Sequence, residues 1–123
     1  MFKISHELPV NMLSRSFEIN DYEYCLPHLL DQNKIYRKHF EDAKESGSYI
    51  IMDNSLHELG KAYDTKRLLY WVNHLEPNEF IVPDVWQNKS LTLVNAKRWL
   101  DIELPENTTK VAVVQASDYA EAY

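Results

Sequence analysis

The sequence predicts an α/β fold built on a parallel sheet, and three observations lead to this prediction. Short apolar runs rich in β-branched and aromatic residues alternate with segments of helical periodicity. The runs at 50–52, 80–82 and 111–114 are continuously apolar, which indicates strands that are buried on both faces. The spacing between the runs suits crossover connections between parallel strands. We therefore expect a parallel β/α repeat of about five strands in a single domain that spans residues 1–123.

Five segments have the composition of strands, and each is bounded by turn or polar residues. They are residues 2–5, 22–30, 48–53, 80–84 and 110–116. Helical periodicity is present between them. The expected helices are a short turn at 10–16, longer helices over 32–46, 65–75 and 89–102, and the start of another after Ser117. The stretch 54–63 reads as a loop.

Residues that favour helix ends support these helices. Asp31 and Asp64 are expected N-caps, Asn88 or Ser90 is expected to begin the last long helix, and Gly47 suits the C′ position of the first. Other side chains recur at helical spacing and are expected to face the core. They are Ile35, His39, Phe40 and Ala43; Leu68, Val72 and Leu75; and Leu93, Ala96 and Leu100.

Composition and charge exclude several classes of protein. The net charge of −6, with both signs mixed, opposes nucleic-acid binding through this chain alone, because neutralising phosphates requires a basic surface. Two glycines are too few for a P-loop or a dinucleotide-binding glycine cluster. The single cysteine, Cys25, favours a reducing, cytoplasmic setting. No apolar run is long enough for a membrane span, and we expect no signal peptide at the N-terminus.

Polar side chains follow the five expected strands at the points where the strands end. They are His6, His28, Asp53, Asp84 and Gln115. Asp84 lies 31 residues after Asp53, and Gln115 lies 31 residues after Asp84. The carboxyl ends of parallel strands open onto one face, so we expect these side chains to converge on a shared pocket. Glu58, in the loop after Asp53, is a further candidate for its rim.

Simpler roles exist for the same residues. An aspartate that follows a strand often caps the next turn or helix, and a histidine there is often an ordinary hydrogen-bonded residue. Another interpretation takes His6, Asp53 and Asp84 as ligands of a divalent metal ion, since carboxylate and imidazole groups bind such ions. The eight tyrosines and three tryptophans suit core packing better than base stacking.

Three of the strand-end motifs resemble the active-site strands of the tRNA-guanine transglycosylase superfamily. They are "IIMDNSLHELG", "FIVPD" and "VAVVQA". Those enzymes are (β/α)8 barrels with an Asp-Ser-Gly-Gly-Phe-Gln motif, an aspartate that ends a later strand, and a Gly-Ile-Val-Gln-Gly-Gly strand. With "ISHELP" at its start, the chain looks closest to the bacteriophage DpdA-like branch, which is associated with inserting 7-deazaguanine bases into DNA. The resemblance implies the N-terminal half of a TIM barrel.

The resemblance also implies roles for three residues. Asp53 matches the carboxylate that acts near the glycosidic carbon, while Asp84 and Gln115 match the residues that contact the purine base. The sequence departs from the family where Ser55-Leu56 replace two glycines. It has no counterpart of the nucleophilic aspartate of a later strand or of the zinc-binding cysteines, and we expect no cofactor.

The expected function is therefore exchange of guanine for a 7-deazaguanine base in DNA or tRNA, with a missing half or a partner chain supplying the nucleophile and the nucleic-acid groove. The expected catalytic residue is Asp53, and the expected substrate-binding residues are Asp84, Gln115, His6, His28 and Glu58. The alternative is a non-catalytic module that binds a nucleobase or a partner protein. An open sheet edge would also favour self-association.

Overall fold

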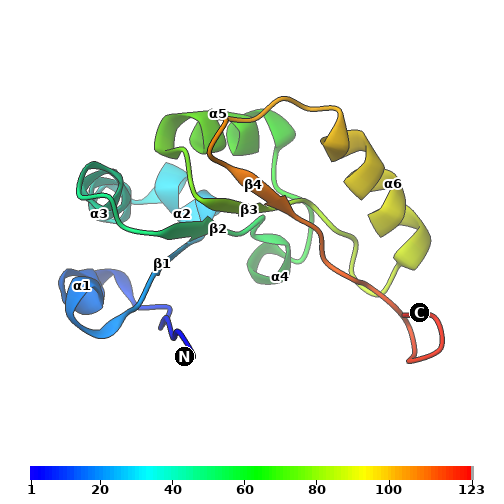
Figure 1. Ribbon diagram of the computed structural model, residues 1–123, viewed down its shortest axis with the longest axis horizontal. Helices are drawn as coiled ribbons and strands as arrows, with labels where there is room; N and C mark the ends of the chain where they lie inside the picture. The colour runs from blue at the N-terminus through cyan, green and yellow to red at the C-terminus, as the bar shows by residue number, and fades with distance from the viewer. Residues whose placement is uncertain (123) are drawn as a thin grey trace.

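The computed structural model describes residues 1–122 and contains a four-stranded parallel sheet (Figure 1). The strands lie side by side in the order β1-β2-β3-β4, which is also their order in the sequence. Their bounds are β1 Glu23–Cys25, β2 Ile50–Met52, β3 Glu79–Ile81 and β4 Thr109–Val111. All three strand pairs are parallel, which confirms the predicted parallel α/β class. β1 and β4 form the edges of this sheet, so the described residues do not close a barrel.

Helices precede the sheet and connect its strands. They are the 3-10 helix η1 Val10–Arg15 and the α-helices α1 Ser16–Ile19, α2 Pro27–Gln32, α3 Lys34–Glu45, α4 Leu56–Leu59, α5 Thr65–Leu75 and α6 Lys89–Leu100. Within the described residues, none of these helices combines the length and the apolar character that a membrane crossing requires.

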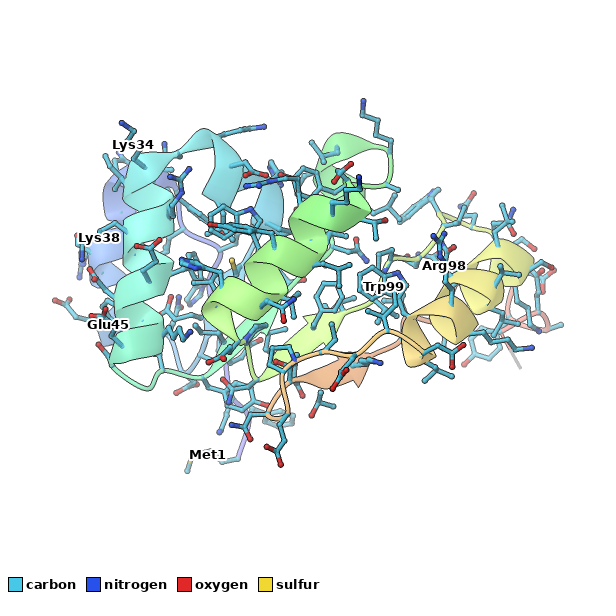
Figure 2. The ribbon with its side chains drawn as sticks, turned by 90° about the horizontal axis from the view of Figure 1, so that it is seen from above. Met1, Lys34, Lys38, Glu45, Arg98 and Trp99 are labelled. Atoms are coloured by element: carbon cyan, nitrogen blue, oxygen red, sulfur yellow. The ribbon has the colours of Figure 1, made fainter. Side chains whose placement is uncertain are left out.

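The long helices cover one face of the sheet. Neighbouring parallel strands that follow one another in sequence place their crossover helices on the same side. Accordingly, α3, α5 and α6 lie above the sheet in Figure 1 and spread across it in the view from above (Figure 2). The opposite face carries half-buried side chains, among them the register partners Tyr24 and Ile51, and Ile81 two residues beyond Glu79, the partner of Ile51 on β3.

The core lies between this helical layer and the sheet. Met52 and Phe80 from the central strands are fully buried against Leu68, Val72 and Leu75 of α5. These α5 residues confirm the predicted apolar stripe, because three- and four-residue spacing places them on one side of a helix. From α6, Trp99 points toward the middle of the molecule (Figure 2), and its ring centroid lies 5.2 Å from that of Phe80.

Two predicted N-caps are confirmed. The side chain of Asp64 accepts a hydrogen bond from the backbone N–H of Arg67, and that of Asn88 accepts one from Leu91. Asp31 is wrong as a cap, because it lies inside the separate helix α2, and Asn33 caps α3 instead.

The predictions were wrong for the first strand and for the length of others. The strand expected over 110–116 ends at Val111. Residues 2–5 form no strand, and Ile4 is bonded to Asp21 through both backbone groups rather than to a sheet. The strand expected over 22–30 stops at Cys25, because Pro27 begins α2. Proline suits the first turn of a helix, where its missing N–H is not needed. The sheet therefore has four strands instead of about five.

Helical periodicity also gave wrong predictions for some core residues and for two segments. Ile35, Leu93 and Leu100 were expected in the core, yet they are exposed, while α6 buries Thr92 and Trp99 instead. The stretch 54–63 contains the short helix α4 rather than loop alone. Residues 118–122 form turns rather than the start of a helix, and Tyr123 lies outside the described residues.

Candidate functional site

A hollow of about 270 Å³ lies beyond the carboxyl ends of the strands, where loops after β2, β3 and β4 meet. It combines carboxyl and amide groups with aromatic and aliphatic side chains. The lining residues are Tyr24, Asp53, Asn54, Leu56, His57, Ile81, Asp84, Trp86, Val113 and Gln115. This is the end of a parallel sheet at which ligands are usually bound.

Asp84 is the buried polar centre of this pocket, with 7% of its surface exposed. Its Oδ1 accepts a hydrogen bond from Asn54 Nδ2 at 2.8 Å, and its Oδ2 accepts one from Gln115 Nε2 at 2.5 Å. Asn54 Nδ2 also bonds to the carbonyl oxygen of Val82 at 3.1 Å. These contacts fix the orientation of the Asp84 carboxyl group between two amide donors.

Gln115 reaches the pocket from beyond the sheet, since β4 ends four residues earlier at Val111. Both ends of its amide are engaged. Nε2 donates to Asp84, and Oε1 accepts a hydrogen bond from the backbone N–H of Gln87 at 3.0 Å. The side chain therefore links the buried carboxyl group to the loop after β3.

Asp53 directly follows β2 and faces the pocket from the open face of the sheet. Its Oδ2 accepts a hydrogen bond from the backbone N–H of Ser55 at 3.0 Å, and the Tyr24 hydroxyl donates another. Burial raises the pKa of Asp53, and the nearby carboxyl group of Glu58 raises it further. Asp53 therefore retains a proton to a higher pH than an ordinary aspartate.

The turn after Asp53 is held from beneath by His28. Ser55, fully buried, adopts a left-handed conformation with φ of 61°. Its Oγ is hydrogen-bonded to His28 Nδ1 at 2.8 Å, from the first turn of α2. Asn54 Oδ1 accepts a hydrogen bond at 2.9 Å from the backbone N–H of Leu56, which begins α4. The turn is therefore defined by side chains from two elements.

Carboxyl groups and a phenol in and near the pocket influence one another's pKa. Partial burial raises the pKa of Glu7, and the carboxyl groups of Glu58 and Asp53 raise it further. Burial also raises the pKa of Tyr24, as does its neighbour Asp53. Glu7, Asp53 and Tyr24 therefore keep their protons more readily than the same groups would in open solvent.

Trp86 extends from a tight turn beside the pocket, with 60% of its surface exposed. Two hydrogen bonds with Thr92 fix the turn at Val85. The backbone N–H of Val85 donates to Thr92 Oγ1 at 2.9 Å, and the Thr92 hydroxyl donates to the carbonyl oxygen of Val85 at 3.1 Å. Beyond the tryptophan, Gln87 has a positive φ of 50° and bonds to Gln115.

Three of the predicted site residues line the pocket, two lie behind or beside it, and His6 does not line it. Asp53, Asp84 and Gln115 line one pocket, as their strand-end positions indicate. His28 supports the turn behind it, and Glu58 is exposed nearby on α4.

His6 is not among the side chains that line the pocket within residues 1–122. The strand that should have carried it is not formed. Its backbone N–H donates to Asn20 Oδ1 at 2.7 Å, and its side chain is exposed.

Sequence reasoning missed the four other polar or aromatic residues that line the pocket. Tyr24 lies inside β1 rather than at its end, and Asn54 is directly next to a predicted site residue. The exposed pair His57 and Trp86 was not assigned to a site. A usable signal was the alternation within β1, which turns Tyr24 to the face opposite Cys25.

The interpretation as a metal site is not supported. Among residues 1–122, no three His, Cys, Asp or Glu side chains lie close enough together to hold a metal ion. Carboxyl groups instead meet amide and hydroxyl donors, as Asp84 and Asp53 do.

Comparisons of this chain with protein-family models, with curated proteins and with solved structures find no match.

Proposed function

We propose that this pocket binds guanine or a 7-deazaguanine base and serves exchange of that base at an N-glycosidic bond of DNA or tRNA. The observation that carries the proposal is the direct contact between Asp84 and Gln115, with Asp53 in the same pocket. The resemblance to transglycosylases assigns base recognition to the first two residues and a role at the glycosidic carbon to the third.

The Asp84–Gln115 pair is complementary to the edge of guanine. That edge presents an acceptor, O6, followed by two donors, N1–H and the exocyclic amine. Gln115 Nε2 has a second hydrogen for O6, and each Asp84 oxygen has a further lone pair for a base donor. Base binding therefore does not require that the bonds to Asn54 and Gln115 break.

Adenine presents the opposite pattern, with its amino group where guanine has O6. It would place a donor against Gln115 and leave a buried Asp84 oxygen without its base donor. An unmatched buried polar group costs about 1–3 kcal/mol, so we expect a preference for guanine of about five- to 150-fold. Replacing N7 by carbon leaves this edge unchanged, so the pair accepts both guanine and 7-deazaguanine.

Asp53 suits proton transfer to the departing base. In base exchange a nucleophilic carboxylate bonds to C1′ as the bond from C1′ to the guanine nitrogen breaks, and the base gains a proton. The incoming base then loses a proton as its nitrogen displaces the carboxylate. Burial raises the pKa of Asp53, so this residue keeps a proton to a higher pH than an ordinary aspartate and is a better candidate to pass one to the departing base. The resemblance assigns the nucleophile to a later strand, outside this sequence.

Two structural features are compatible with the resemblance. Ser55 stands where the family pattern has its first glycine, and its backbone has the left-handed conformation that glycine adopts without strain. Parallel strands that are neighbours in sequence order are also the arrangement of a (β/α)8 barrel. The net charge of −6 suits a division of labour in which another chain or segment contacts the phosphates.

Asp84→Asn tests base recognition, because an amide presents a donor where the base needs an acceptor. We expect about tenfold weaker binding of 7-deazaguanine, measured by isothermal titration calorimetry. Asp101→Asn is the matched control, since Asp101 is exposed at the end of α6. Unfolding curves check that the Asp84 variant stays folded, and Gln115→Ala provides a second test that leaves Asp84 bonded to Asn54. Undiminished binding in both pocket variants contradicts the proposal.

The second candidate is a module that binds the base without chemistry. It is favoured because the Asp84–Gln115 pair can read a base with no nucleophile beside it. Incubation of the purified chain with labelled guanine and a guanine-containing oligonucleotide separates the two candidates. Incorporation of label by wild type but not by Asp53→Ala demonstrates exchange, whereas binding without incorporation identifies the module.

A further inference from the structure

An aromatic hollow adjoins the base pocket. It measures about 260 Å³ and is lined by Leu56, His57, Gly60 and Trp86. All but the glycine also line the base pocket, so the two hollows are neighbours. The rings of His57 and Trp86 lie 5.8 Å apart at their shared border. The base pocket contains carboxyl and amide groups, whereas the second hollow is lined mainly by apolar and aromatic side chains. Each is smaller than a typical pocket for a drug-sized ligand, which suits one planar ring system.

Trp86 is unusual in being both exposed and held in place. An indole with 60% of its surface in solvent gains little from burial within this chain. Yet the turn that carries it is held by hydrogen bonds on both sides. Thr92 bonds to the backbone of Val85, and Gln115 bonds to the backbone N–H of Gln87. A turn that is already held in place reduces the backbone freedom that is lost when a ligand stacks on its aromatic ring. This combination is typical of a contact surface rather than of a packing residue.

We infer that the aromatic hollow receives the base adjacent to the one held by Asp84 and Gln115. The ligand of the site is then an unpaired stretch of nucleic acid longer than a single nucleotide, with Trp86 as the stacking surface. This inference rests on the proposed function. Stacking tolerates any base, because every base has a π-face. The hollow therefore adds affinity without adding sequence preference.

Stacking also suits the charge of the mouth. The neighbouring carboxyl groups of Glu7, Asp53 and Glu58 repel phosphates, and their mutual proximity is evident in the raised pKa of Glu7. Lys61, next to Gly60, is the cation adjacent in sequence. A single phosphate contact on a single strand gives a log–log salt slope of about −0.7, so binding should depend on salt no more steeply than this.

Gln115 connects the two hollows. Its amide nitrogen bonds to Asp84 in the base pocket, and its amide oxygen bonds to the backbone of Gln87 beside Trp86. The same side chain therefore contacts both the base pocket and the turn that carries Trp86.

The test compares deoxyguanosine with the deoxydinucleotide GpA by titration calorimetry, with ribo-GpA and deoxy-ApA as further arms. Wild type should bind GpA about tenfold more tightly than deoxyguanosine. Trp86→Ala should remove that factor, so that GpA and deoxyguanosine bind this variant equally, while Trp86→Phe retains most of the factor. Tyr70→Ala, which removes an exposed ring from α5, is the matched control. The two sugar forms of GpA distinguish DNA from RNA as the source of the strand.

Each outcome decides the inference. Equal binding of GpA and deoxyguanosine, or equal loss of both in Trp86→Ala, overturns the stacking hollow while the guanine pocket stands. Equal binding of GpA and ApA, both lost in Trp86→Ala, upholds the stacking hollow and overturns guanine recognition. If neither the nucleoside nor any dinucleotide binds to wild type, both proposals fail.

Discussion

At the scale of single residues, the site depends on side chains whose neighbours constrain them. Asp84 is buried only because Asn54 and Gln115 supply donors to its two oxygens. A buried carboxyl group without such partners would be costly. Ser55 shows a related constraint in the backbone, since it holds a left-handed conformation while its hydroxyl bonds to His28. The pocket residue Asp84 and the turn at Ser55 thus depend on neighbouring side chains that hold them in place.

Substitutions of Ser55 separate its backbone strain from its hydrogen bond. Both Ser55→Gly and Ser55→Ala remove the hydroxyl that bonds to His28. Glycine relieves the left-handed backbone and alanine does not, so the glycine variant should be more stable by about 1 kcal/mol. Urea unfolding of the two variants measures this difference. Equal stability would mean that the positive φ at Ser55 carries no strain.

At the scale of elements, the ends of helices and the turns after strands determine where functional groups lie. Pro27 ends β1 early and starts α2, which brings His28 beneath the turn of Ser55. α5 ends on Glu76, which has a left-handed φ of 47°, before Pro77 directs the chain into β3. Helices commonly end on a residue of this conformation, and glycine is preferred there.

Replacing Glu76 tests the end of α5. Glu76→Gly should be more stable than Glu76→Ala by about 0.5–1 kcal/mol, because glycine adopts the left-handed cap without a Cβ clash. Both variants lose the exposed ion pair with Lys44, at 3.2 Å, so that loss cancels in the comparison. Thermal and urea unfolding provide the measurement. An alanine variant as stable as the glycine variant would contradict this account of the cap.

At the scale of the whole molecule, the two ends of the sheet differ in chemistry. The carboxyl end carries the pocket, whereas the amino end carries a buried network that holds the N-terminal helices. Glu23 Oε2 accepts hydrogen bonds from Ser16 Oγ at 2.6 Å and from His39 Nε2 at 2.9 Å. The network joins β1 to α1 and α3. In parallel β/α folds this end contributes stability, and the opposite end binds ligands.

This network makes acid stability depend on Glu23. Burial alone would raise the pKa of Glu23, but the hydrogen bonds from His39 and Ser16 outweigh it and lower the pKa. A lowered carboxyl pKa gives stability above the unfolded value of about 4.3, and this stability is lost as the pH falls through the folded value. Wild type should therefore lose more stability below about pH 4.3 than Glu23→Gln does.

The measurement is urea unfolding at a series of pH values, with Glu106→Gln, an exposed glutamate in the connector before β4, as control. Asp53 and Glu7 act in the opposite sense, because their raised pKa values mean that protonation at low pH stabilises the fold. They remain in every variant, so the difference between wild type and Glu23→Gln isolates Glu23. Parallel pH curves for these two proteins would contradict the prediction.

The sequence by itself determined the parallel α/β class and the convergence of Asp53, Asp84 and Gln115. Apolar runs at crossover spacing indicate parallel strands, and parallel strands necessarily end on one face. Both inferences use only local composition and spacing. The N-caps at Asp64 and Asn88 were predictable for the same reason, since a cap bonds to backbone groups two or three residues away. The expectation that the strands are buried on both faces was wrong, because the long helices cover one face and Ile51 and Ile81 on the other face are only half-buried.

Only the tertiary structure decided which side chains touch. The bond between Asp84 and Gln115 joins residues 31 positions apart, and it depends on loop paths beyond the strand ends. Trp86 joins the site because Thr92 and Gln115 fix its turn, and His6 leaves it because no strand forms at 2–5. Such contacts arise from long-range packing and from left-handed backbone positions, which the periodicity of a sequence does not encode.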